Sequence, residues 1–268
     1  MVMDWGRTLA VGDGANDVNM INAANIGVGV RGIEGSQATR AADYVIGEFK
    51  ILKKLIIYYG MNFYYRNSQV TLYNLYKNIL VTFPIIAYGP LSILSSTYIY
   101  DTWIFQFYNL FYTSLPIIIF GLTDIKYSQY ELSKNPLIYK IGQSSTFFNI
   151  KTIASIFVTT SFFGSLFVYV AYYATEFNLL PEGYMTFQIW SGMLVFNICV
   201  ISVNIRIFML SNQISLLLSL SVILSVLSYY LIFMFVGNIL YSDVKNVLNK
   251  QLVSGTFWLV LLSMVAAI

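Results

Sequence analysis

The chain has 268 residues, of which 57% are hydrophobic, 17% aromatic and only 10% charged. Because an ordinary soluble domain carries about 25% charged residues, this composition excludes a simple water-soluble globule. Histidine is absent and Cys199 is the single cysteine, which excludes histidine general bases, Ser-His-Asp triads, internal disulfides and cysteine-rich metal cages. A net charge of +3 without a basic tract gives no reason to expect a nucleic-acid partner. The remaining class is an integral membrane protein with a small water-facing part.

The first 66 residues differ in composition from the rest of the chain. They hold seven of the 15 Lys and Arg residues and six of the 12 Asp and Glu residues. Short strands are predicted at 8–11, 26–30 and 44–46, with helices between them and a run of helix formers over 48–59. We expect a partial α/β segment, because about 66 residues are too few to close a doubly wound domain.

Six later segments are long and apolar enough to be membrane spans, which need about 20 residues each. They lie near 70–91, 101–121, 153–175, 185–207, 214–236 and 252–268. The positions of Lys and Arg, above all in the loop 122–152, predict that the head, this loop and both chain ends face the cytosol. The expected fold is mixed: a partial α/β segment followed by an all-α bundle of six transmembrane helices.

The loop after the first predicted strand reads Gly12-Asp13-Gly14-Ala15-Asn16-Asp17 and places two carboxylates and an amide within five residues. Mg²⁺ prefers oxygen ligands and keeps several waters, and glycines let the backbone approach a phosphate closely. The same residue types are common in an ordinary strand-to-helix turn, so both interpretations remain open here. The pattern matches neither GxGxxG nor the P-loop, which argues against a dinucleotide or Walker-type site.

Polar residues interrupt the first two predicted spans. Lys77 lies about eight residues inside the first, where a charge costs about 2.5–3.5 kcal/mol, so it must face protein, water or a partner, or extend to the interface. In the second span, Gln106, Asn109, Thr113 and Pro116 are three, four and three residues apart, which predicts one polar stripe. Contacts between helices and the lining of a lipid path are both compatible with such a stripe.

Several of these segments resemble one known family. VGDGANDVNMI at 11–21 resembles the hinge motif of P-type ATPases, and GVGVRGIEGSQATRAADY at 27–44 resembles the version found in phospholipid flippases, the type IV branch. LYNLYKN at 72–78 and YNLFYTSLP at 108–116 are similar to the fifth and sixth spans of that branch. The resemblance covers nearly the whole chain and is strongest at 9–80.

The resemblance implies a role for particular residues. Residues 1–66 would be the C-terminal end of a haloacid-dehalogenase-like phosphorylation domain with its linker helix, and residues 67–268 the membrane domain. Asp13 and Asp17 would hold Mg²⁺, and Asn16 with Asp17 would contact the phosphate of the nucleotide. The residues implied to form the lipid pathway are Lys77, Asn78, Asn109 and Thr113.

The resemblance also implies the function. We expect the C-terminal portion of an ATP-driven flippase that moves aminophospholipid-like lipids to the cytosolic leaflet, with ATP as substrate and Mg²⁺ as cofactor. Phospholipid and the membrane are the implied partners, together with an accessory β-subunit of the flippase type. The sequence contains no DKTG and no Asp-Lys pair, so we expect this chain to be inactive without the phosphorylated aspartate of a complete protein.

Two alternatives remain, one from another class and one that is still an enzyme. A non-catalytic membrane fragment that binds lipid or a partner subunit is the literal interpretation of these residues. A cation-transporting P-type ATPase would need several carboxylates inside the membrane, because a desolvated cation requires oxygen ligands. The spans 70–91 and 153–175 contain no Asp or Glu, which disfavours cation transport.

Overall fold

The computed structural model separates into two compact units. One unit is formed by Met1–Phe63 with Tyr127–Lys140, and the other by Tyr64–Lys126 with Ile141–Ile268. A segment far along the chain therefore packs with the N-terminal region. The structure describes residues 6–32, 36–95, 97–176, 188–239 and 246–267.

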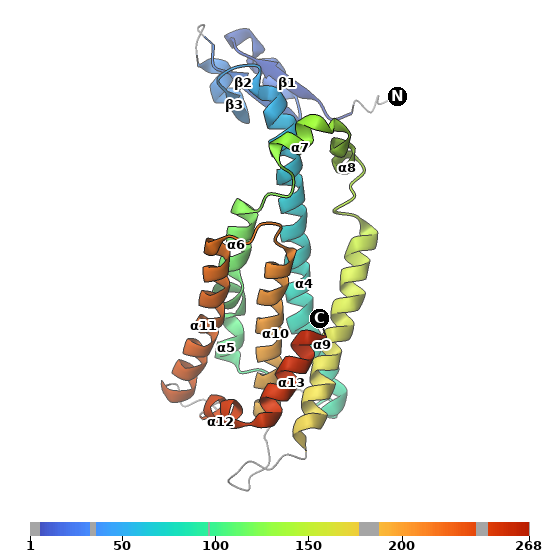
Figure 1. Ribbon diagram of the computed structural model, residues 1–268, viewed down its shortest axis with the longest axis vertical. Coiled ribbons are helices and arrows are strands. Elements are labelled where there is room, and N and C mark those ends of the chain that lie inside the picture. Colours follow the sequence, from blue (N-terminus) through green and yellow to red (C-terminus); the bar gives the residue numbers. More distant parts are fainter. Residues whose placement is uncertain (1–5, 33–35, 96, 177–187, 240–245, 268) are drawn as a thin grey trace. The chain divides into compact units, whose positions relative to one another are not determined.

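Three short parallel strands form the sheet of the first unit, in the order β1-β2-β3 (Figure 1). β1 (Leu9–Gly12) pairs with β2 (Ile26–Val30), which pairs in turn with β3 (Tyr44–Ile46). The predicted strands at 26–30 and 44–46 are confirmed, and the first strand begins one residue later than predicted. The first unit thus contains a small, partial α/β segment.

Short helices connect the strands, as parallel pairing requires. The 3-10 turn η1 (Ala15–Asp17) leads into α1 (Val18–Ala23), and α2 (Gln37–Ala41) lies between β2 and β3. Their apolar side chains make a small core with the sheet, in which the fully or almost fully buried members are Ala10, Ile21 and Ala38.

Beyond the sheet the first unit continues as helix. α3 (Ile51–Lys53) runs without a break into the π-helical segment η2 (Lys54–Gly60) and then into α4 (Met61–Leu91). The later segment of this unit contains three further short elements. They are α7 (Gln129–Lys134), the 3-10 turn η4 (Pro136–Ile138) and the first two residues of α8 (Tyr139–Gln143), which continues into the second unit.

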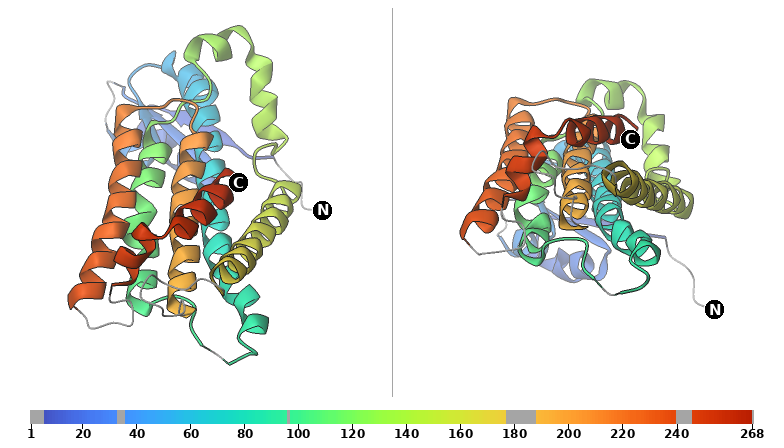
Figure 2. Two further views of the ribbon diagram at one scale, coloured as in Figure 1. Left: turned by 60° about the horizontal axis from the view of Figure 1, so that its bottom comes forward. Right: turned by 90° about the horizontal axis from the view of Figure 1, so that it is seen from below.

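Every regular element within the described residues of the second unit is a helix. Figure 1 shows α6, α10 and α11 side by side, with α9 beyond α10. Seen from below, α13 lies across α9 and α10 (Figure 2). The elements besides the second part of α4 are α5 (Thr102–Gln106), η3 (Tyr108–Tyr112), α6 (Ser114–Thr123), α9 (Ile150–Glu176), α10 (Gln188–Leu210), α11 (Leu216–Ile239), α12 (Val247–Val253) and α13 (Gly255–Ala266).

Three of the described helices, α9, α10 and α11, are long and apolar enough to cross a membrane. The pair α12 and α13 would make a fourth if it counts as one span, although it bends by 82° at its break. Six spans were predicted. α4 contains the segment 70–91 but carries too many polar residues to meet the same criterion, and residues 185–187 and 268 of two predicted spans lie outside the described residues.

The predicted span 101–121 is divided into three pieces, α5, the π-helical η3 and α6. Asp101 begins α5, where its carboxylate accepts a hydrogen bond from the backbone N–H of Ile104 at 3.0 Å. Thr113 separates η3 from α6 with φ −135° and ψ −13°, outside the helical region. A periodicity of 3.6 residues therefore does not hold along the whole segment.

α10 forms the centre of the helical unit, since most of its side chains are buried. Its Cys199 thiol lies 3.5 Å from the carbonyl oxygen of Leu80 in α4. Pro84 lacks the N–H that would otherwise bind this carbonyl, so the thiol occupies a position that the proline leaves open. On the α9 side, Gly164 packs against Pro84, where an added Cβ would lie 3.2 Å from the ring. Proline, thiol and glycine thus fix how three helices meet.

Candidate functional site

The loop after β1 is organised around Asp17. Its Oδ2 accepts hydrogen bonds from the backbone N–H of Asp13 at 3.1 Å and of Gly14 at 3.3 Å. A side chain on Gly12 would collide with the Asp17 carboxylate, so this close approach requires glycine. Gly14, by contrast, has φ −109°, which any residue can adopt. The Asp13 side chain lies against Gly32, where an added Cβ would be 3.3 Å from it.

The oxygen atoms on this loop suit one class of metal. Asp13 and Asn16 are exposed and Asp17 is half-buried, and Oδ1 of Asp17 has no hydrogen-bond partner among the described residues. Within that part of the chain, no group of three or more His, Cys, Asp and Glu could enclose an ion. Two carboxylates on an open loop fit Mg²⁺, which keeps several waters and takes phosphate oxygens as further ligands. They do not form an all-protein cage.

In the helical unit, Lys77 and Thr113 meet although they are 36 residues apart. The Lys77 ammonium group donates a hydrogen bond to the Thr113 hydroxyl at 3.1 Å, and that hydroxyl donates to the carbonyl of Tyr108 at 3.0 Å. The Tyr108 hydroxyl in turn donates to the carbonyl of Lys77 at 2.9 Å. Lys77 is 6% exposed and Thr113 is fully buried, so α4 and the break between η3 and α6 are joined here by a closed polar network.

The remaining predicted pathway residues are arranged differently. Asn78 and Asn109 are exposed, as is Gln106, whereas Thr113 and Pro116 are buried. The predicted stripe along residues 106–116 is therefore not a single buried face. The cause is the π-helical η3, which adds backbone between the two halves and rotates the later residues relative to the earlier ones.

A buried carboxylate beyond α6 was not singled out from the sequence. Asp124 is 2% exposed, and its Oδ1 accepts from the backbone N–H of Asn212 at 2.8 Å and of Gln213 at 3.1 Å. Its Oδ2 accepts a hydrogen bond from Nδ2 of Asn212 at 2.8 Å. The same Nδ2 also donates to the hydroxyl of Tyr65 at 2.9 Å. These bonds fix the loop between α10 and α11 to the end of α6. The partner lies 88 residues away, so no local pattern could reveal it.

Lys126 completes this cluster. Its ammonium group lies 4.4 Å from the ring centres of both Tyr65 and Phe147, a cation–π arrangement. Partial burial lowers the pKa of Lys126 below its usual value, while the Asp124 carboxylate acts in the opposite direction. From the sequence, the loop lysines were expected only to set the orientation of the chain. Tyr65 is 61 positions before Lys126, so no local pattern could predict this contact.

The chain is similar to known proteins of one family. A family described as phospholipid-translocating P-type ATPase C-terminal matches residues 39–268. Over 95% of its length the chain is 34% identical to phospholipid-transporting ATPase DRS2 of Saccharomyces cerevisiae, and over 96% it is 32% identical to phospholipid-transporting ATPase IH of Homo sapiens. Over 60% it is 41% identical to phospholipid-transporting ATPase C887.12 of Schizosaccharomyces pombe. The chain spans 19%, 23% and 13% of these relatives, respectively.

Proposed function

Because the chain belongs to the phospholipid-translocating P-type ATPases and is a multi-pass membrane protein, we propose that it is the C-terminal portion of an ATP-driven flippase. In the complete protein this flippase moves aminophospholipid-like lipids to the cytosolic leaflet. Asp13, Asn16 and Asp17 serve phosphoryl transfer, and Lys77, Asn78, Asn109 and Thr113 line the lipid pathway. An accessory β-subunit remains an implied partner.

The observation that carries the proposal is the buried charge of Lys77. Its ammonium group has a hydroxyl as hydrogen-bond partner, and no carboxylate lies within ion-pair distance of it among the described residues. An uncompensated cation at this depth is costly and is characteristic of substrate pathways. The phosphate of a lipid headgroup supplies the missing negative charge. The exposed amides of Asn78 and Asn109 offer donors and acceptors for the rest of the headgroup.

The β1 loop supports the second half of the proposal. Asp13 and Asp17 would hold Mg²⁺, which supplies neutralisation of phosphate charge when it is bound. The two backbone N–H groups that bind Asp17 keep its carboxylate oriented, and the exposed amide of Asn16 is available to a phosphoryl oxygen. The nucleotide-binding domain and the phosphorylated aspartate belong to parts of the complete protein that this chain does not contain.

The proposal is tested by substituting Lys77 and Thr113 in the complete protein. Lys77→Ala removes the charge, and we expect lipid-stimulated ATPase activity to fall about tenfold to hundredfold, the loss of one hydrogen bond to a charged group. Thr113→Val should give a smaller loss, because the ammonium group of Lys77 is still present and only its hydroxyl partner is removed. Thr113→Ser keeps the hydroxyl and should have the activity of the unsubstituted protein.

Thr159→Ala is the matched control. The Thr159 hydroxyl donates to the carbonyl of Ser155 within the same helix, so its removal leaves the contact between helices intact. Its activity should equal that of the unsubstituted protein. If Lys77→Ala leaves the lipid dependence unchanged, Lys77 is a structural residue and the proposed pathway is wrong.

A further inference from the structure

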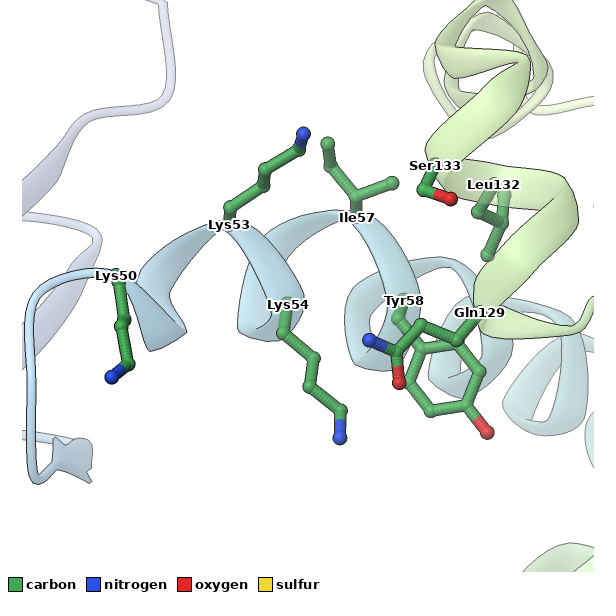
Figure 3. A pocket seen from close by; sticks show the side chains of 8 residues that line it. All are labelled: Lys50, Lys53, Lys54, Ile57, Tyr58, Gln129, Leu132 and Ser133. Carbon is green, nitrogen blue, oxygen red and sulfur yellow. The ribbon is translucent and has the colours of Figure 1, made fainter.

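A cavity of about 210 Å³ lies within the first unit, between two segments that are more than 70 residues apart in the sequence. One wall comes from α3 and η2, the other from α7 (Figure 3). Sites that enclose drug-sized ligands have volumes of about 300–1,000 Å³. The volume of this cavity is smaller, so it suits a small chemical group rather than a large ligand. The lining residues are Lys50, Lys53, Lys54, Ile57, Tyr58, Gln129, Leu132 and Ser133.

The charge around this cavity is not balanced. Lys50 forms an ion pair with Glu48, with 2.5 Å between Nζ and Oε2. Glu131, the acidic residue of α7, accepts hydrogen bonds from the backbone and hydroxyl of Ser128. Both neighbouring carboxylates are therefore engaged, and Lys53 and Lys54 form no ion pair within the described part of the chain. The ammonium group of Lys54 lies 5.7 Å from the centre of the Tyr59 ring, a contact that does not neutralise its charge.

From this imbalance we propose that the cavity is a binding site for a phosphate-type anion. Lys53 and Lys54 supply the positive charge, and the side chains of Gln129 and Ser133 supply hydrogen-bond donors on the opposite wall. The two ammonium groups leave the helix on opposite sides in Figure 3, so the anion is held by attraction to flexible side chains rather than by a rigid cradle. Binding is therefore sensitive to ionic strength.

The anion comes from the aqueous phase. The residues that line the cavity lie outside all six predicted spans, the first of which begins 16 residues after Lys54, and the sequence predicts that this part of the chain faces the cytosol. Inorganic phosphate or a soluble phosphate ester is therefore the expected ligand, and a lipid phosphate is the alternative that the second arm of the test decides.

Titration calorimetry with inorganic phosphate tests this site in the purified chain in a neutral detergent. We expect saturable binding that weakens between about 0.01 M and 0.15 M salt. Lys53→Gln and Lys54→Gln should each weaken it about fivefold, the effect of one lysine near an anionic partner. Lys134→Gln is the matched control, because Lys134 carries the same charge in the same unit but does not line the cavity. It should change the affinity less than twofold.

A second arm separates the two sources of phosphate. The chain is placed in nanodiscs of phosphatidylcholine with or without phosphatidic acid, and the reactivity of Lys53 and Lys54 toward an amine reagent is read by mass spectrometry. Free phosphate should protect both lysines in either nanodisc. Protection by phosphatidic acid alone would overturn the proposal, as would the absence of saturable phosphate binding or equal weakening by Lys134→Gln.

Discussion

The side-chain amide of Asn62 pairs with the backbone of Tyr127 in both directions. Its Oδ1 accepts from the Tyr127 N–H at 3.2 Å, and its Nδ2 donates to the Tyr127 carbonyl at 3.0 Å. The same Nδ2 lies 3.0 Å from the carbonyl of Tyr58, one helical turn earlier. Asn62 is 3% exposed. Its buried side chain binds both the N–H and the carbonyl of Tyr127, as the backbone of a neighbouring β-strand would. The segment 127–140 is thereby attached to the N-terminal unit.

Replacement of Asn62 should release this segment. Asn62→Ala leaves the N–H and carbonyl of Tyr127 without their side-chain partner, which costs about 1–3 kcal/mol. We expect faster amide hydrogen exchange over residues 127–134, measured by mass spectrometry. Asn67→Ala, on the exposed face of the same helix, is the control and should leave exchange unchanged. Equal exchange in the two variants would show that other contacts fix the segment.

A close contact at α10 makes a second prediction. An added Cβ on Gly192 would overlap the carbonyl oxygen of Ile99, a backbone atom that cannot turn away. Gly192→Ala should therefore lower the free energy of unfolding by about 1–3 kcal/mol, the usual effect of overpacking. Gly255→Ala has no atom within 4 Å of the new Cβ and should be neutral or stabilising. Thermal unfolding of both variants in the same detergent makes the comparison, and equal midpoints would contradict the contact.

The first turn of α7 should depend on pH through Glu131. Hydrogen bonds from the backbone N–H and then the hydroxyl of Ser128 lower the pKa of this exposed carboxyl. Since the folded pKa is below the unfolded one, the stabilisation is present above the usual pKa of about 4.3 and is lost as the pH falls through the folded value.

The amide chemical shift of Ser128, followed by NMR during an acid titration, reports this equilibrium directly. Its midpoint should lie below that of a glutamate in an unstructured peptide. Glu131→Gln should abolish the titration, and Glu48→Gln, which removes a carboxyl from another part of the unit, should preserve it. A midpoint at or above the peptide value would contradict the hydrogen bonds to Ser128.

The sequence allowed the local elements to be predicted where the pattern is short-range. The strand at 26–30 was predictable because apolar residues alternate with Gly27 and Gly29, and strands need only a few residues of such pattern. The two carboxylates of the β1 loop were singled out because they are four residues apart. What could not be predicted is the binding of Asp17 to the backbone of Asp13 and Gly14, since a carboxylate at a helix start usually faces forward.

Contacts between distant residues account for the rest. Thr113 was predicted to lie on a regular helix, and no residue near it predicts the π-helical segment that brings its hydroxyl within hydrogen-bond distance of Lys77. Asp124 and Asn62 were not singled out at all, because each obtains its partner from a residue more than 60 positions away. A pattern within one element carries no information about such pairs.

The contact between Cys199 and Leu80 has a practical consequence. The only thiol of the chain is fully buried and faces a backbone oxygen, so sulfhydryl reagents will not reach it while the helices stay assembled. A cysteine introduced anywhere on the surface can therefore carry a fluorophore or spin label alone, without first mutating the native one. Conversely, labelling of the unmodified chain marks the moment at which the helical bundle opens.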